Sequence, residues 1–327
     1  MKAIVYEKYG SPDVLQLKEV EKPTPKNNEV LVKIHAASVN DWDWGLLRGT
    51  PFVNRLISGL LKPRIKTIGC DMAGRVEVVG RNAKQFQPGD EIFGDISGCG
   101  FGAFAEYVCA HENALMLKPA SMTFEEAAAV PQAAVLALLG LRDKGHIQSG
   151  QKVLINGAGG GAGTFAVQIA KSFETEVTGV DSTRKLDIMR SIGADHVIDY
   201  TKEDFTKSGQ RYDLILDMAA HHSVFDYKRA LSPNGIYVIE GGSMARLLQI
   251  VLLGPLITMI GGKKMGMLAH KPNKDLAFMK ELFETGKVKP VIDKRYPLSK
   301  VPEALRYFGK GHNRGKVVIT VKHDDKA

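Results

Sequence analysis

Cysteine is scarce in this chain. The three cysteines are Cys70, Cys99 and Cys109, and no two of them form a Cys-x-x-Cys pair. An odd number of cysteines excludes a complete disulfide framework of the kind that small secreted domains use to reinforce a limited core. We therefore expect a protein of the reducing cytoplasm.

Long uninterrupted apolar runs are also missing. The most apolar stretch, residues 247–260, is interrupted by Gln249, Gly254 and Pro255, and it is shorter than the ~20 residues of a bilayer-spanning helix. We expect this stretch to be buried in a core, to line a pocket or to form a subunit interface, and we expect no membrane partner. The N-terminal residues 1–17 carry charges throughout and lack the apolar core of a signal peptide.

Charge of one sign does not collect anywhere along the chain. Lys and Arg number 44 against 36 Asp and Glu, for a formal net charge of +8. The basic residues are interspersed with acidic ones, and no aromatic and basic stripe indicates a nucleic-acid partner. The 327 residues, 44% of them hydrophobic, suffice for two packed domains of roughly 150 residues each.

The first third of the chain has a β-rich pattern. Short runs of β-branched and aromatic residues alternate with Gly, Pro and Asn turns, which predicts a mainly antiparallel, partly barrel-like domain up to residue 122. The clearest predicted strands cover residues 3–6, 29–34, 74–79 and 103–109.

An alternation of helices and strands begins at residue 123. Thr123 and Glu126 form a capping-box pattern ahead of a predicted helix over residues 127–141. Apolar strands separated by helices then predict a parallel sheet covered on both faces, the doubly wound α/β arrangement. The strands are predicted over residues 152–156, 176–180, 196–198, 214–218 and 236–239, and the helices over 163–173 and 183–192.

The C-terminal region is expected to return to the first domain. It contains a predicted helix over residues 275–284 and a predicted strand over 316–321. The first domain would then comprise residues 1–122 and 271–327, and the doubly wound domain residues 123–270.

A glycine-rich turn connects the strand over 152–156 to the following helix. It reads Gly157-Ala158-Gly159-Gly160-Gly161-Ala162-Gly163. Glycines let the backbone turn tightly and approach a pyrophosphate, which the free amides of a helix N-terminus hold. Strand, turn and helix in this order predict a dinucleotide site. Its candidate contacts in the turn are Gly157, Gly159, Gly160, Gly161 and Ala162.

The end of the next strand leaves the identity of the dinucleotide open. A carboxylate at Asp181 favours NADH, because it accepts hydrogen bonds from the ribose hydroxyls. Ser182, Arg184 and Lys185 follow it directly and suit the 2′-phosphate of NADPH. Alternatively, Asp181 or Ser182 only caps the next helix and both cations are solvated.

Six motifs carry a resemblance to a known family. They are residues 36–43 (AASVNDWD), 69–76 (GCDMAGRV), 87–94 (QPGDEIFG), 102–107 (GAFAEY), 166–171 (AVQIAK) and 193–200 (GADHVIDY). In this order the chain resembles the zinc-independent, quinone oxidoreductase-like branch of the medium-chain dehydrogenase/reductase superfamily. The resemblance implies an α/β fold with a Rossmann domain and a discontinuous, mainly antiparallel GroES-like substrate domain. It also implies a homodimer and an active site in the cleft between the domains.

The resemblance assigns further candidate cofactor contacts. Tyr200, with Arg184 and Lys185, would lie near the adenosine. Residues toward the nicotinamide would be Met218, Ala219, Gly241 and Gly242. Lys316 would reach the cofactor, or it is a strand-end lysine on the surface. The sequence departs from the family at residues 135–137, which lack a hydroxyl, and at residues 218–222, which contain His221-His222.

The family's zinc ligands are not retained. By the resemblance the first ligand position is Asn40, the family's Gly-His-Glu becomes Gly69-Cys70-Asp71, and the third position falls near Ala133. One thiol cannot hold zinc in the usual three-ligand way. Adjacent histidines such as His221 and His222 rarely converge on one ion, so we expect no metal.

Without a Lewis acid, hydride transfer is easiest to an acceptor that is already electrophilic. We therefore expect NADH- or NADPH-dependent reduction of a quinone or an α,β-unsaturated carbonyl. Asn40, water or a cofactor hydroxyl would meet the developing oxyanion; alternatively Asn40 is a turn residue. Asp43 and Arg48 are expected to form an ion pair or hydrogen-bond network. The competing hypotheses are a non-catalytic, NAD(P)H-binding structural or RNA-associated protein and an alcohol dehydrogenase-like activity.

Overall fold

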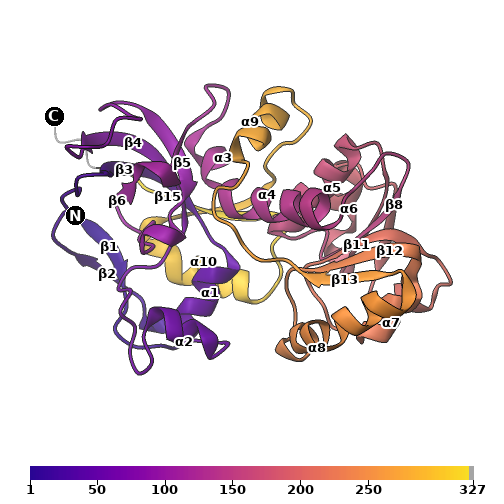
Figure 1. Ribbon diagram of the computed structural model, residues 1–327. Helices are drawn as coiled ribbons and strands as arrows, with labels where there is room; N and C mark the ends of the chain where they lie inside the picture. Colours follow the sequence, from indigo (N-terminus) through magenta and orange to yellow (C-terminus); the bar gives the residue numbers. More distant parts are fainter. Residues whose placement is uncertain (324–327) are drawn as a thin grey trace. The chain divides into compact units, whose positions relative to one another are not determined.

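The computed structural model describes residues 1–323, and the chain divides into two compact units (Figure 1). Unit 1 contains Met1–Gln132, Pro272–Lys280 and the chain from Ile292 onward, and unit 2 contains Ala133–Lys271 and Glu281–Val291. The predicted boundaries lie after residue 122 and after residue 270, and the observed boundaries differ from both. Unit 1 extends past residue 122 because α3 (Phe124–Ala128) packs on its sheet, where Phe124 stacks on His35 at 4.4 Å between ring centroids.

A seven-stranded sheet forms the centre of unit 1. Six strands follow the order β14-β15-β3-β4-β5-β7, and β6 also pairs with β3. The β14 and β15 pair is parallel, and the other pairs are antiparallel. Because β15 pairs with β3, the predicted return of the C-terminal region to the first domain is confirmed. The strands are β3 (Glu29–Ser38), β4 (Asp71–Val79), β5 (Glu91–Asp95), β6 (Tyr107–His111), β7 (Met116–Leu117), β14 (Ile292–Pro297) and β15 (Lys316–Thr320), with β1 (Lys2–Val5) and β2 (Gln16–Glu19) paired separately.

Short helices pack around this sheet. Residues on the inner side of β3, Val30, Val32 and Ile34, join one core with Leu46 of α1 and Leu305 of α10. The helices of unit 1 besides α3 are α1 (Asp41–Arg48), α2 (Val53–Ser58) and α10 (Val301–Gly309), and α9 (Leu276–Glu284) begins in unit 1 and ends in unit 2.

Unit 2 is built on a six-stranded parallel sheet, as the doubly wound prediction required. The strand order is β10-β9-β8-β11-β12-β13 and every pair is parallel. Leu154, Ile215 and Tyr237 face a core that α7 and α8 complete. Their neighbours along each strand point to the other face, since side chains alternate. The strands are β8 (Lys152–Asn156), β9 (Glu176–Asp181), β10 (His196–Asp199), β11 (Tyr212–Asp217), β12 (Leu231–Ile239) and β13 (Lys264–Met267).

Two predictions about helical segments differ from the structure. The single helix predicted over residues 127–141 is wrong: α3 ends at Ala128 and a new helix starts at Pro131, which lacks the amide needed inside a helix. Residues 247–260 lie in α8, where only Ile250, Gly254 and Ile257 are buried, so the alternative of a core segment is wrong. The alternatives of a pocket wall and a subunit interface stay predictions. The helices are α4 (Pro131–Leu138), continued by a π-helical turn, α5 (Gly161–Ser172), α6 (Leu186–Ser191), α7 (Val224–Ala230) and α8 (Met244–Gly261).

Candidate functional site

The carboxyl ends of β8, β11 and β12 bring several predicted cofactor residues together. A Cβ atom at Gly157 would lie 3.4 Å from Met218 and 3.5 Å from Ala219. Gly242 forms an isolated parallel bridge with Ala220, and the Ala220 amide donates to the Gly241 carbonyl. In parallel sheets ligands favour this edge.

A buried polar pair fixes the two central strand ends. Asp217 at the end of β11 accepts hydrogen bonds from Asn156 Nδ2 of β8 at 2.8 Å and from Tyr237 Oη at 2.8 Å. It also accepts the Ala219 amide at 3.0 Å. Burial raises the pKa of Asp217, and these hydrogen bonds oppose the rise. The sequence analysis missed this pair, although a polar residue at the end of each apolar strand was the available signal.

The glycine-rich turn is shaped by close backbone approach. Gly157 has φ +86°, a left-handed conformation that favours glycine, and a Cβ at Gly163 would lie 2.1 Å from the Gly157 carbonyl oxygen. Gly160 is the N-cap of α5 and supplies no capping side chain. The amides of Gly161, Ala162 and Gly163 donate to no acceptor within residues 1–323. Three free amides at the start of a twelve-residue helix suit an anionic group.

Asp181 holds the turn against the end of β9. Its carboxylate accepts the Gly159 amide at 3.0 Å and the Ser182 amide at 2.8 Å. The ammonium of Lys185 lies 3.5 Å from the same carboxylate, and both side chains are buried. The negative charge of Asp181 is therefore largely compensated by Lys185, which is not a solvated cation.

Arg184 and Tyr200 remain accessible beside this pair. Arg184 is exposed and forms no ion pair in the described part of the chain. Tyr200 is half exposed, and its amide donates to the Asp181 carbonyl. The Thr183 hydroxyl is already used, because it donates to the Asp199 carboxylate. Arg184 is thus the cation of this segment that is free to meet a phosphate.

Unit 1 contains a buried polar cluster around Asn40. Lys316 Nζ donates to Asn40 Oδ1 and lies 3.8 Å from the Asp71 carboxylate, which accepts Asn40 Nδ2 at 2.9 Å. This orientation of the Asn40 amide suits both charges. In the flipped orientation Nδ2 would face the Lys316 ammonium and Oδ1 would face the Asp71 carboxylate. The Asn40 Nδ2 group also donates to Cys70 Sγ at 3.3 Å, an ordinary length for a hydrogen bond to sulfur, and lies 3.4 Å from the Ser38 carbonyl. Lys316 is 2% exposed, so the alternative of a surface lysine is wrong.

Asp43, a residue of α1, supports the same cluster. Its carboxylate accepts the Asn40 amide at 2.9 Å and the Gly69 amide at 2.9 Å. Burial raises the pKa of Asp43 to about 8. The predicted network around Asp43 is present, but its partner is not Arg48, whose guanidinium lies 5.0 Å from the Trp44 ring centroid.

Gln132 is a further polar residue that the sequence analysis missed. Its backbone amide donates to Asp71 at 3.1 Å. Its side-chain Nε2 is buried and meets no acceptor among the residues described. A buried donor without a partner is unfavourable and calls for an explanation such as a ligand.

Whether this cluster fits a zinc ion can be judged from its donors. Cys70 Sγ and the carboxylates of Asp71 and Asp95 lie within 4.8 Å of one another, and Asp95 was not among the residues considered from the sequence. Asp71 already accepts hydrogen bonds from Asn40 Nδ2 and from the Gln132 backbone amide, so its carboxylate is not free to bind a metal ion. Lys316 adds a fixed positive charge beside Asp71. The donor set therefore does not fit a zinc ion.

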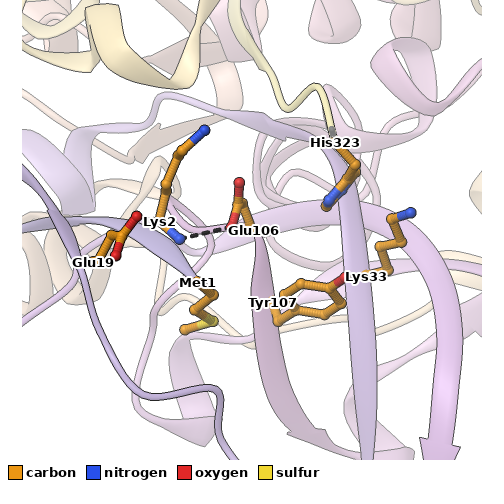
Figure 2. Close-up of a pocket in the computed structure, with 7 residues that line it drawn as sticks. All are labelled: Met1, Lys2, Glu19, Lys33, Glu106, Tyr107 and His323. Carbon is orange, nitrogen blue, oxygen red and sulfur yellow. Dashed lines mark hydrogen bonds between the residues drawn. The ribbon is translucent and has the colours of Figure 1, made fainter. Parts of the chain in front are cut away.

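A surface hollow of about 310 Å³ lies elsewhere in unit 1 (Figure 2). Lys2, Glu19, Glu106 and His323 are among its lining residues, and the Lys2 amide donates to Glu106 at 2.6 Å. None of its lining residues belongs to the Asn40 cluster, so we assign no part of the reaction to it.

Comparisons with known proteins cover both units. A model described as "Alcohol dehydrogenase GroES-like domain" matches residues 26–120 and one described as "Zinc-binding dehydrogenase" matches residues 192–319. The 2-methylene-furan-3-one reductase of Solanum lycopersicum is 36% identical over 98% of this chain and 79% of its own length. The chloroplast envelope quinone oxidoreductase homolog of Arabidopsis thaliana is 34% identical over 98% of each protein.

Solved structures agree with these matches. The quinone oxidoreductase from Coxiella burnetii superposes with a TM-score of 0.88 and is 27% identical, over 98% of this chain and 99% of that one. The Escherichia coli quinone oxidoreductase complexed with NADPH has a TM-score of 0.85 over 98% of this chain and 100% of that one, but at 22% identity it supports the fold alone.

Proposed function

Because this chain belongs to the quinone oxidoreductase-like branch of the medium-chain dehydrogenase/reductase superfamily, we propose that it uses NAD(P)H to reduce a quinone or an α,β-unsaturated carbonyl. The observation that carries the proposal is the glycine turn of unit 2, with the free amides of Gly161, Ala162 and Gly163 at the carboxyl edge of a parallel sheet. Relatives named as quinone and enone reductases match nearly the whole chain.

We assign the phosphate contacts of the dinucleotide to unit 2. The pyrophosphate would lie on the free amides of α5, next to Gly157, Gly159 and Gly160. Ser182 and Arg184 would meet the 2′-phosphate of NADPH, because Lys185 already compensates Asp181. Tyr200 would lie beside the adenosine. Met218, Ala219, Gly241 and Gly242 would border the nicotinamide half along the ends of β11 and β12.

The nicotinamide, when bound, supplies a hydride. The chain's own contribution is to orient the acceptor and to stabilise the negative charge that develops on its oxygen. We assign this task to the unpartnered amide of Gln132 and to Asn40, whose amide would exchange its hydrogen bond to Cys70 for one to the acceptor oxygen. We propose that Lys316 is a positioning residue that holds Asn40 in the donating orientation. The cofactor contact predicted for Lys316 stays a prediction. The reaction proceeds without zinc in this proposal.

The alternatives are less well supported. Oxidation of an unactivated alcohol needs a metal or a base to take the hydroxyl proton, and the Cys70, Asp71 and Asp95 set does not fit zinc. The non-catalytic alternative, an NAD(P)H-binding structural or RNA-associated protein, has no observation of its own, whereas relatives named as reductases match 98% of this chain.

Three further features remain proposals. We infer that the protein is cytoplasmic from its cysteine content. We infer a homodimer from the family resemblance, with the free edge of β13 (Lys264–Met267) as the available pairing strand. We expect no nucleic-acid partner. Sedimentation velocity of the pure protein tests the homodimer.

Oxidation of NADPH and of NADH by 1,4-benzoquinone and by a simple enone, followed by absorbance, tests the activity. Turnover should survive prolonged chelator treatment and should greatly exceed turnover with ethanol. Binding of the dinucleotide without turnover of either acceptor would favour the non-catalytic alternative. Stoichiometric zinc in the pure protein, with activity lost on its removal and restored on its return, would favour the alcohol dehydrogenase alternative.

A further inference from the structure

Helix α8 exposes a continuous apolar surface. Met259 and Ile260 are each 83% exposed and Leu252 is 69% exposed. The other large exposed residues of this face are Leu248, Val251 and Leu256. The helix is long and apolar enough to cross a membrane by length and composition, and only 17% of it is buried. An apolar surface of this kind on a folded domain marks an interaction site.

The opposite side of α8 is anchored to its domain. Ile250 and Ile257 enter the core of unit 2 together with Met265 of β13. A Cβ at Gly254 would lie 3.1 Å from the Met265 carbonyl, and the Met265 amide donates to Thr258 Oγ1 at 3.2 Å. The helix lies beside α7 and β13 (Figure 1). It cannot leave this position without exposing the core, so its apolar face is held outward and the helix is not free to span a bilayer.

The chain segment that contains α8 carries charge of one sign. From Gly241 to Lys271 the chain contains Arg246, Lys263, Lys264 and Lys271 and no acidic residue. Burial and the neighbouring Arg211 and Lys228 lower the pKa of Lys263, which indicates that positive charge is concentrated at this end of α8. An occupant of this face would therefore be apolar within and negatively charged at its boundary.

We propose that the exposed face of α8 docks on the surface of an anionic phospholipid bilayer, with the helix in the plane of the headgroups. Leu, Val, Ile and Met side chains would enter the acyl boundary, and the flanking Arg246, Lys264 and Lys271 would meet lipid phosphates. The earlier expectation of no membrane partner rested on the length needed to span a bilayer, which does not bear on docking.

A second copy of the chain fits this face less well. If two α8 helices packed antiparallel about a twofold axis, Lys263 and Lys264 of one copy would approach Arg246 of the other. Like charges brought together oppose association. The face also offers no exposed aromatic residue within α8 and few polar side chains to fix a register with a protein partner.

Vesicle flotation tests the proposal. The full chain is mixed with phosphatidylcholine vesicles that contain or lack phosphatidylglycerol. We expect binding only to the anionic vesicles, reduced by added salt. Leu252→Glu/Met259→Glu should lower binding about tenfold or more, and Lys264→Gln/Lys271→Gln should lower it while keeping the apolar face. Leu17→Glu, which changes an exposed leucine of β2 in unit 1, should have no effect.

Three outcomes would overturn the proposal. One is equal binding of the wild type and Leu252→Glu/Met259→Glu to anionic vesicles, or no binding by either. A second is a wild-type oligomer that this variant dissociates, with no flotation, which would assign the face to self-association. A third is reduced turnover of a soluble quinone by the variant with flotation unchanged, which would make α8 a wall of the substrate pocket. Thermal melting and NADPH binding confirm that each variant is folded, and they separate these results from a failure of the proposed function.

Discussion

The ammonium of Lys316 lies 3.8 Å from the carboxylate of Asp71, and both side chains are buried. These residues belong to β15 and β4, which are far apart in the sequence. Asn40, at the start of α1, bridges them through the two ends of its amide. The last strand of the chain therefore supplies the charge that balances the acidic residues of the cluster.

Removal of that charge should destabilise unit 1. Lys316→Met leaves Asp71 buried without its cation, and breaking a buried pair in this way costs about 3–5 kcal/mol. Urea unfolding measures the loss. The double variant Lys316→Met/Asp71→Asn should recover a substantial part of it, because no unpaired charge is left. Equal losses in the single and double variants would show that the ion pair is not the source of the effect.

The pH dependence of stability should reflect Asp43. Burial raises its pKa from 3.8 to about 8, so the folded protein retains a proton that the unfolded chain releases between these values. Its contribution to the free energy of unfolding is thus fully present below pH ~4 and is lost as the pH rises through ~8. Urea unfolding at several pH values should show a steeper decline for the wild type than for Asp43→Asn. A parallel decline in the two proteins would contradict the raised pKa.

The sequence predicted the fold well where local patterns decide it. The strand Lys152–Asn156 and the return of the C-terminal strand to unit 1 follow from apolar periodicity and family resemblance. The predicted helix over 127–141 was wrong because Pro131 overrides the apolar period. For α8 the alternative of a buried core segment was wrong, because an apolar sequence does not reveal which of its sides meets the sheet.

The candidate site was predictable only in part. The glycine turn and Asp181 are local signals, and the structure places them together. The Lys185 to Asp181 pair, the burial of Lys316 and the unpartnered Gln132 amide depend on how distant segments pack. No spacing rule along the sequence encodes such contacts.

Gln132 should affect turnover more than stability. Gln132→Met removes a buried donor that has no protein partner, so the free energy of unfolding should be unchanged or slightly higher. If the amide stabilises the developing oxyanion, kcat should fall by about tenfold to a hundredfold. Gln132→Leu, which also lacks the donor and adds no charge beside Asp71, should give the same result. A variant that is destabilised but has normal kcat would assign Gln132 a structural role.

The choice between NADPH and NADH should depend on Arg184. Arg184→Ala removes the exposed cation and should weaken NADPH binding about tenfold, the effect of one charge-assisted hydrogen bond, with little change for NADH. Fluorescence titration with each dinucleotide measures both affinities. Lys287→Ala, which removes another exposed cation of unit 2, is the control. Asp181→Ser is a poorer probe, because loss of its bonds to the Gly159 and Ser182 amides should loosen the turn and weaken both cofactors.

Two glycines of the turn should respond differently to an added side chain. A Cβ at Gly160 meets only the Gly157 carbonyl oxygen, at 3.3 Å, whereas one at Gly163 meets it at 2.1 Å and would disturb the fold itself. Gly160→Val should therefore leave the melting temperature close to that of the wild type and abolish dinucleotide binding. Gly163→Val should lower both. Fluorescence titration and thermal melting of the two variants separate these effects. If Gly160→Val binds NADPH and NADH with unchanged affinity, the turn is not the pyrophosphate site, and the assignment of the cofactor to this edge of the sheet is wrong.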